Sequence, residues 1–211
     1  MNKFTHAELD GGLVLPLVEE FYSIQGEGGN VGKAAHFLRL AGCNVCCKWC
    51  DAKESWNSKK FPLLRVEELV AKVVDSGAIN VVITGGEPLL HQLDYLTTEL
   101  HKVGVSIFLE TSGSSPFSGD FDWVCLSPKR ARLPINEAYE RATELKMVIE
   151  DVDRDFEWAQ ECGVKVSEST LLLLQPEWSK ADKILPAIVE FVKKNPRWVI
   201  SLQTHKYMRI P

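Results

Sequence analysis

Short apolar segments alternate with longer amphipathic ones along most of the chain. Apolar runs of about four to eight residues bounded by glycine or polar residues are typical of buried strands, and apolar residues recurring about every three to four positions are typical of helices. The strand-like segments are residues 35–40, 80–84, 105–109, 123–126, 145–149, 171–175 and 198–202. The helical segments are residues 66–76, 91–103, 136–144, 154–162 and 180–194.

This alternation predicts the fold class. Strands that alternate with helices imply βαβ units and a parallel sheet whose strands are buried on both faces. A closed eight-fold barrel typically needs about 250 residues, and this chain has 211. We therefore expect an α/β fold, an incomplete, open (β/α) barrel with about six to seven mostly parallel strands. The whole chain, 1–211, is expected to be a single domain, with residues 1–12 as a flexible N-terminal segment.

Composition and charge narrow the class of protein. Apolar residues make up 45% and charged residues 25% of the chain, as in folded globular proteins, and the net charge of −5 argues against a basic face for nucleic acid. No apolar run approaches the roughly 18 residues of a membrane span, and the first residues lack the apolar core of a secretory signal. We expect a cytoplasmic protein that binds neither nucleic acid nor membrane.

Polar and glycine-rich segments follow six of the predicted strands. Because the carboxyl ends of parallel strands meet at one edge of the sheet, where α/β folds place their sites, we expect these segments to line a common active site. They are the segment from Arg39 through the cysteines, 84–88, 110–113, 127–129, 175–176 and 203–206.

Four of the six cysteines lie within eight residues, Cys43, Cys46, Cys47 and Cys50. Two CxxC pairs would imply zinc, but zinc pairs are normally separated by roughly 15–20 residues and these have no spacer. The spacing C-x3-C-x2-C, with Cys43, Cys47 and Cys50 as ligands, fits a [4Fe–4S] cluster with one iron open to an external ligand. Cys46 as a fourth ligand would instead give an electron carrier. The two remaining cysteines are expected to be small buried apolar residues.

The cysteine spacing after a strand resembles the signature of the radical S-adenosylmethionine (SAM) superfamily. Trp49 matches the aromatic residue usual before the last cysteine, and the GGEP segment 85–88 resembles the motif that contacts SAM. The resemblance implies that Cys43, Cys47 and Cys50 hold the cluster and that SAM chelates the open iron. It also implies the residues that bind SAM, which are Trp49, Asp51, Gly86, Glu87, Ser127, Pro128, Lys129 and Gln175. From the residues alone, Lys129 is equally an ordinary surface lysine.

Blocks farther along the chain resemble one family within this superfamily, the 7-carboxy-7-deazaguanine synthases of queuosine biosynthesis. The blocks are residues 21–28, 37–44, 82–88, 110–113, 127–129 and 203–207. The resemblance implies a homodimer, an external electron donor such as flavodoxin, and a lyase reaction. A radical derived from SAM takes a hydrogen from 6-carboxy-5,6,7,8-tetrahydropterin, the ring contracts, ammonia is lost, and 7-carboxy-7-deazaguanine forms.

The chemistry of that substrate matches several residues of these blocks. The amine and amide donors of a pterin suit Glu27 with Gln25 beside it, and a substrate carboxylate suits the planar guanidinium of Arg39. The expected substrate contacts are Ile24, Gln25, Gly26, Glu27, Arg39, Thr84, Glu110, His205 and Pro211. Glu110 is equally well explained as a buried carboxylate that caps the next turn.

Ala52 departs from the family pattern, which commonly has a hydroxyl residue contacting Mg²⁺ at this position. Because Mg²⁺ prefers oxygen ligands, the requirement for this ion is an open question, although Asp51, water and substrate offer oxygens. Two alternatives remain. A radical SAM activase of a glycyl-radical enzyme explains the cysteines but not Gln25–Glu27 with the C-terminal block, and a non-catalytic metal-binding interaction module explains only the cysteines.

Overall fold

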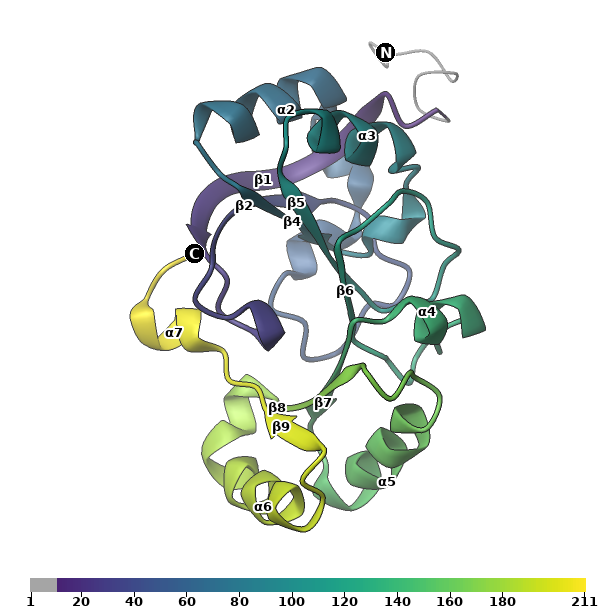
Figure 1. Ribbon diagram of the computed structural model, residues 1–211, viewed down its shortest axis with the longest axis vertical. Coiled ribbons are helices and arrows are strands. Elements are labelled where there is room, and N and C mark those ends of the chain that lie inside the picture. Colours follow the sequence, from purple (N-terminus) through teal and green to yellow (C-terminus); the bar gives the residue numbers. More distant parts are fainter. Residues whose placement is uncertain (1–10) are drawn as a thin grey trace.

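Nine strands form one continuous sheet in the part of the chain that the structure, a computed structural model, describes, residues 11–211 (Figure 1). The strand order is β3-β1-β2-β4-β5-β6-β7-β8-β9. The strands are β1 (Val14–Ile24), β2 (Ala34–Leu40), β3 (Leu63–Arg65), β4 (Asn80–Gly85), β5 (Ser106–Thr111), β6 (Trp123–Leu126), β7 (Glu144–Ile149), β8 (Leu171–Pro176) and β9 (Trp198–Ile200). The two ends of the sheet do not pair with each other, so the barrel is open.

The seven strands expected from the apolar runs are present and run parallel, as β2 and β4 to β9. The expected total of about six to seven strands was nevertheless too low. β1 and β3 lie antiparallel at one edge of the sheet. Residues 14–17 of β1 are apolar and buried, but they include Pro16, and from Glu19 onward the strand is only half-buried or exposed, so no buried apolar run marks its whole length. β3 is only three residues long.

Helices cover the outer face of the sheet in two groups, with α2 and α3 at one end and α5 and α6 at the other (Figure 1). The helices α2, α3, α5 and α6 each bury an apolar stripe, in two separate apolar clusters. Leu69 of α2 and Leu96 of α3 share one cluster with Ile83 of β4. The helices are α2 (Val66–Asp75), α3 (Asp94–Lys102), α4 (Asn136–Arg141), α5 (Val152–Gly163), α6 (Ala181–Lys194) and α7 (Thr204–Met208). No helix in the described range is both long and apolar enough to cross a membrane.

The turn that follows β1 lies on the inner side of the sheet and connects its two ends. The backbone N–H of Gly29 donates to the Glu144 carboxylate at 2.6 Å, and that of Gly28 donates to the Ser201 hydroxyl at 3.1 Å. Thr204 N–H donates to the carbonyl of Gly26 at 2.8 Å. A turn anchored to the last strands therefore spans the gap in the barrel. The expected flexible segment 1–12 falls mainly on residues 1–10, which lie outside the described residues.

Candidate active site

A cavity of about 280 Å³ opens on the inner side of the sheet. It is lined by the turn after β1 and by segments at the carboxyl ends of β2, β4, β5, β6, β8 and β9, as expected for parallel strands. Every site residue predicted from the sequence lines this cavity except Glu87 and Pro128. Pro128 is buried outside the cavity lining. The convergence of distant segments is therefore confirmed, and it brings the cysteines and the expected substrate residues into one space.

Glu87 faces the protein rather than the cavity, with 1% of its surface exposed. Its carboxylate accepts hydrogen bonds from the Thr111 hydroxyl at 2.5 Å, from the Ser112 backbone N–H at 2.9 Å and from the Leu89 N–H at 3.1 Å, and also from the Ser112 hydroxyl. Its side chain thus fixes the segment after β5 to the segment after β4. The prediction of a SAM contact finds no support in the placement of this side chain.

The residues from Gly42 to Trp56 form a segment that we call the cysteine loop. The backbone N–H of Cys43 donates to the carbonyl of Trp56 at 3.2 Å, and the ring of His91 hydrogen-bonds the carbonyl of Ala41 at 2.8 Å. Gly86 packs against the loop so closely that a β-carbon there would lie 2.2 Å from the carbonyl oxygen of Gly42. The GGEP segment therefore supports the cysteine loop directly.

Three of the four clustered thiols face the cavity. Cys43, Cys47 and Cys50 are half-buried and line it, whereas Cys46 is exposed, outside the cavity lining and in a left-handed backbone conformation with φ of 53°. Among residues 11–211, the only three metal-ligating side chains whose ligand atoms all lie within 4.8 Å of one another are Glu110, Cys125 and Glu144. Thiolates on one tetrahedral zinc lie only about 3.8 Å apart, because each Zn–S bond is about 2.3 Å. The three cavity thiols do not gather around a single ion, which agrees with a larger cluster.

Two further features of the cysteine end fit an anionic cofactor. The indole Nε1 of Trp56 is buried and has no hydrogen-bond partner among the described residues, and Trp56 lines the cavity. The ammonium of Lys129 donates to the carbonyl and hydroxyl oxygens of Ser127 at 2.6 and 2.7 Å and lies 5.6 Å from the ring centre of Trp49. Burial lowers the pKa of Lys129, so this amine is no ordinary surface lysine. Burial also raises the pKa of Cys47, against the opposing effect of Lys129.

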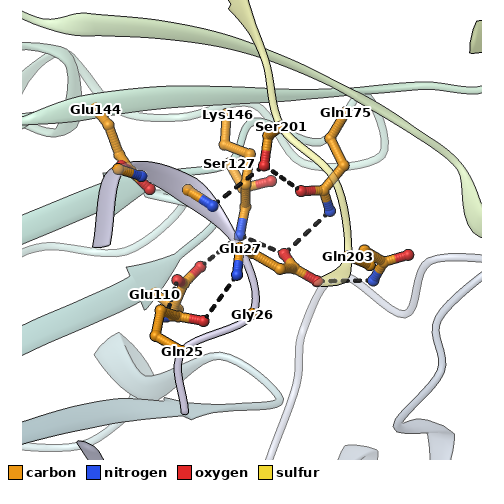
Figure 2. Close-up of polar contacts among 12 residues, drawn as sticks. Gln25, Gly26, Glu27, Glu110, Ser127, Glu144, Lys146, Gln175, Ser201 and Gln203 are labelled. Carbon is orange, nitrogen blue, oxygen red and sulfur yellow. Dashed lines mark hydrogen bonds and ion pairs between the residues drawn. The ribbon is translucent and has the colours of Figure 1, made fainter. Parts of the chain in front are cut away.

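A second part of the cavity wall is a network of carboxylates and amides, which we call the carboxylate floor (Figure 2). The ammonium of Lys146 on β7 donates to Glu27 at 2.7 Å and to Glu110 at 2.8 Å. The amides of Gln175 and Gln203 donate to the same Glu27 carboxylate at 3.0 and 2.7 Å. The floor consists of Gln25, Glu27, Glu110, Lys146, Gln175 and Gln203.

The floor is charged in spite of its burial. Burial alone would raise the pKa of Glu27, but the Lys146 ammonium and the two glutamine amides outweigh it and hold that pKa at about 2. Burial disfavours the ammonium of Lys146, yet the surrounding acidic groups raise its pKa well above the usual range. Both members of the pair are therefore ionised at neutral pH.

The remaining expected substrate residues form the rim of the cavity. Arg39 pairs with Glu19 at 2.7 Å, and half of the Glu19 side chain is exposed. His205 packs on Gly26, where a β-carbon would lie 2.3 Å from its Nδ1, and burial lowers the pKa of this histidine. Pro211 lines the cavity, and its oxygen accepts a hydrogen bond from a serine of β1 at 3.3 Å, so the last residue of the chain is placed against the site.

Sequence reasoning missed Lys146, Ser201 and Trp56 as parts of the site or its support, and it included Gln203 only within the segment 203–206, with no role of its own. Lys146 carried a signal, because a lysine stands inside the otherwise apolar segment 145–149. Ser201 donates to the carbonyl oxygen of Gln175 at 2.8 Å and so fixes its amide, an arrangement that no local pattern predicts.

Comparison with known proteins identifies the class first. Residues 38–183 match the sequence model of the Radical SAM superfamily, and the open parallel sheet with three cysteines on its inner side agrees with this match. The protein is a radical SAM enzyme, a class that uses a [4Fe–4S] cluster and SAM.

The particular family follows from relatives that match over nearly the whole chain. The 7-carboxy-7-deazaguanine synthase of Flavobacterium psychrophilum is 46% identical over the full length of both chains. That of Escherichia coli K12 is 36% identical and covers 92% of this chain and 98% of its own. The crystal structure of QueE from Escherichia coli has a TM-score of 0.80 at 33% identity, covering 96% of this chain and 99% of that one. The chain belongs to the 7-carboxy-7-deazaguanine synthase family.

Proposed function

We propose that this protein converts 6-carboxy-5,6,7,8-tetrahydropterin to 7-carboxy-7-deazaguanine with loss of ammonia, as a radical SAM carbon–nitrogen lyase of deazapurine (queuosine) biosynthesis. The observation that carries the proposal is the joining of two unlike ends in one cavity, three thiols at one end and the carboxylate floor at the other. The relatives named above support it, because they match from end to end.

The cysteine end fits the cofactors. Cys43, Cys47 and Cys50 would hold the cluster, and Trp49, Asp51, Gly86, Ser127 and Lys129 would surround SAM. Gln175, which belongs to the carboxylate floor, would contact SAM where the two parts of the cavity meet. When bound, the cluster and SAM supply a radical able to remove a hydrogen atom from the substrate, and the protein supplies orientation and exclusion of water. The buried ammonium of Lys129 suits the carboxylate of SAM, since a charge-assisted hydrogen bond is roughly twice as strong as a neutral one.

The carboxylate floor suits the donor edge of the pterin. A carboxylate has about four acceptor positions, and three on Glu27 are taken by Lys146, Gln175 and Gln203. A pterin N–H takes the fourth or displaces Gln203. Gln203 is the partner that gives way. Its side-chain oxygen accepts only from Lys206, at 3.1 Å, among the described residues, whereas the side-chain oxygen of Gln175 accepts from a buried serine hydroxyl.

The rim suits the substrate's carboxylate. The guanidinium of Arg39 is partly exposed and its partner Glu19 is half-exposed, and such ion pairs contribute only about 0–1 kcal/mol. Turning Arg39 from Glu19 to a substrate carboxylate therefore costs little. His205 and Pro211 complete the substrate contacts on this side, with Ile24, Gly26 and Thr84 shaping the wall.

A magnesium ion in this site would take its oxygens from Asp51, water and substrate. Ala52 lines the cavity but has no side-chain oxygen, and its carbonyl accepts a hydrogen bond from the Ser55 hydroxyl at 2.6 Å. We expect turnover to respond to added Mg²⁺ less than about 2-fold, and Ala52→Thr to increase the response. Turnover of the chelator-treated protein with graded Mg²⁺ measures both.

We also propose that the protein is a homodimer, works in the cytoplasm and receives electrons from a donor such as flavodoxin. The clustered thiols need a reducing compartment to remain free for a cluster. Light scattering of the anaerobically purified protein gives its oligomeric state, and reduction of the cluster by flavodoxin, followed by its spectrum, tests the donor.

The function is tested by anaerobic turnover with SAM, a reductant and the carboxytetrahydropterin, followed by mass spectrometry. We expect 7-carboxy-7-deazaguanine and about four irons and four sulfides per chain. Stoichiometric zinc without iron would favour the metal-binding module, and SAM cleavage with no conversion of the pterin would favour the activase.

A further inference from the structure

We propose that Lys146 is the positioning residue of the substrate-binding end: its buried ammonium holds the carboxylates of Glu27 and Glu110 together and turned toward the cavity. The inference rests on the proposed function for the identity of the ligand, a pterin. The arrangement of charges around Lys146 does not depend on the identity of the ligand, and a measurement without ligand tests it.

Lys146 sits in the middle of β7 with 4% of its surface exposed, and it lines the cavity. Its ammonium lies between the two carboxylates, 2.7 Å from Glu27 and 2.8 Å from Glu110 (Figure 2). The side chain of Gln25 gives a second connection between the two glutamates. Its amide N–H donates to Glu110 at 3.2 Å, and its side-chain oxygen accepts from the backbone N–H of Glu27 at 3.2 Å. Lys146 therefore ties the turn after β1 to β5 and β7.

Several charged or titratable groups surround Lys146. Glu144 on β7 and Cys125 on β6 lie beside it, and their ligand atoms lie within 4.8 Å of one another and of Glu110. Burial raises the pKa of Glu144. Lys129 after β6 is a second cation and His205 of α7 also faces this part of the cavity, and burial lowers the pKa of both. The acidic groups outnumber the cations, and Lys146 is the cation that contacts both Glu27 and Glu110.

Removing this ammonium leaves two buried carboxylates facing each other. Two like charges at one site raise one pKa strongly, and the pair then retains a proton at neutral pH. A protonated carboxyl group is a poorer acceptor for pterin donors than a carboxylate. Without Lys146, pterin binding should therefore be weak at neutral pH and should strengthen as pH rises and the shared proton is lost. In the wild type, which has Lys146, the affinity for the pterin should show no such rise over the same pH range.

The test compares Lys146→Met and Lys146→Arg with Lys72→Met, a matched control. Lys72 also pairs with a glutamate, Glu20 at 2.6 Å, but on the outer surface with 46% of its side chain exposed. The first measurement is the affinity of the full-length protein for 6-carboxypterin, a fluorescent oxidised analogue, at pH 6.5 to 9, expressed relative to the wild type at each pH because the pterin ring loses its own amide proton within this range. We expect Lys146→Met to bind about 10-fold or more weakly at pH 7 and to recover as pH rises. Lys146→Arg should give a flat profile, and Lys72→Met should match the wild type.

The second measurement needs no ligand. The infrared spectrum of Lys146→Met at pH 7 should gain a protonated-carboxyl band relative to the wild type, and Glu27→Gln or Glu110→Gln, added to the variant, should remove that gain. Absence of that band, an unchanged affinity of Lys146→Met, or an arginine variant as sensitive to pH as the methionine variant each overturns the proposal. A wild type that fails to bind the pterin counts against the proposed function, and the infrared result then still decides the role of Lys146.

If Lys146→Met fails to fold, as its circular dichroism would show, Lys146→Arg decides. A folded arginine variant with both carboxylates ionised and pterin binding retained supports the charge role. One that carries the protonated-carboxyl band although it folds contradicts it.

Discussion

The cysteine loop and the carboxylate floor line different parts of one cavity and are built in opposite ways. The proposed ligands in the cysteine loop, Cys43, Cys47 and Cys50, lie within eight residues, and neighbouring backbone holds them. The floor joins side chains up to 176 residues apart in sequence, as in the hydrogen bond from Gln203 to Glu27, and a buried ammonium holds them. The end that takes the shared cofactor is local, and the end that takes the particular substrate exists only in the folded chain.

The largest effect is expected at the cysteine loop. Changing Cys43, Cys47 or Cys50 to Ala should reduce bound iron from about four per chain to almost none and abolish SAM cleavage, because each thiolate holds one iron. Iron analysis and the electron paramagnetic resonance of the reduced protein measure this. Cys46→Ala is the control and should retain iron, since this thiol is exposed and outside the cavity lining. Loss of the cluster in Cys46→Ala would mean that the ligands are assigned wrongly.

Gly86→Ala tests the contact between the two loops that form the cofactor end. The added β-carbon would lie 2.2 Å from the carbonyl oxygen of Gly42 and 2.9 Å from the β-carbon of Cys43, so backbone must move. We expect a loss of about 3 kcal/mol in the free energy of unfolding, together with lowered iron content. Gly104→Ala, where a β-carbon meets nothing within 4 Å, should lose about 1 kcal/mol to its left-handed backbone and keep its iron. Equal iron loss in both variants would mean that the close contact of Gly86 with Gly42 is not the cause of the loss.

The carboxylate floor makes folding sensitive to acid. The pKa of Glu27 is about 2 in the folded protein and about 4.3 in an unfolded chain, so its contribution is present above pH 4.3 and is lost as pH falls toward 2. About 2 kcal/mol of stability should therefore disappear by pH 3. Urea unfolding at pH 6 and pH 3 measures it. Glu27→Gln should lose less stability than the wild type between pH 6 and pH 3. An equal loss would mean that a group other than Glu27 has the low pKa.

The smallest effect is expected for an ion pair of similar chemistry outside the cavity. Lys72→Met removes the pair with Glu20, in which the Lys72 side chain is 46% exposed. Such pairs contribute less than about 1 kcal/mol, so urea unfolding should shift by no more than that. A larger shift would mean that this exposed ion pair contributes as much as a buried one, so burial would not explain a difference from the pair of Lys146.

The same contrast explains what the sequence could predict. The seven parallel strands, the convergence of loops on one cavity and the cysteine register follow from local patterns, because apolar runs and short spacings lie within a few residues. β1 was missed because its apolar start contains Pro16 and its second half is only half-buried or exposed, and the inward turn of the Glu87 side chain depends on partners that follow the next strand, β5. Lys146 was missed, and the bond of Gln203 to Glu27 was not foreseen, because their partners are distant in the chain. Only the register of β5, β7 and β8 with the turn after β1 brings them together.

The central claim is that the two ends of the cavity do separate work, SAM cleavage at the cysteines and substrate control at the carboxylate floor. It is tested most directly by the amount of 5′-deoxyadenosine released per molecule of 7-carboxy-7-deazaguanine in the wild type and in Glu27→Gln, measured anaerobically with saturating SAM. We predict that the variant still cleaves SAM and that this ratio rises about 10-fold or more, because the substrate is no longer held in place. An unchanged ratio with unchanged product yield would contradict the division of the cavity proposed here.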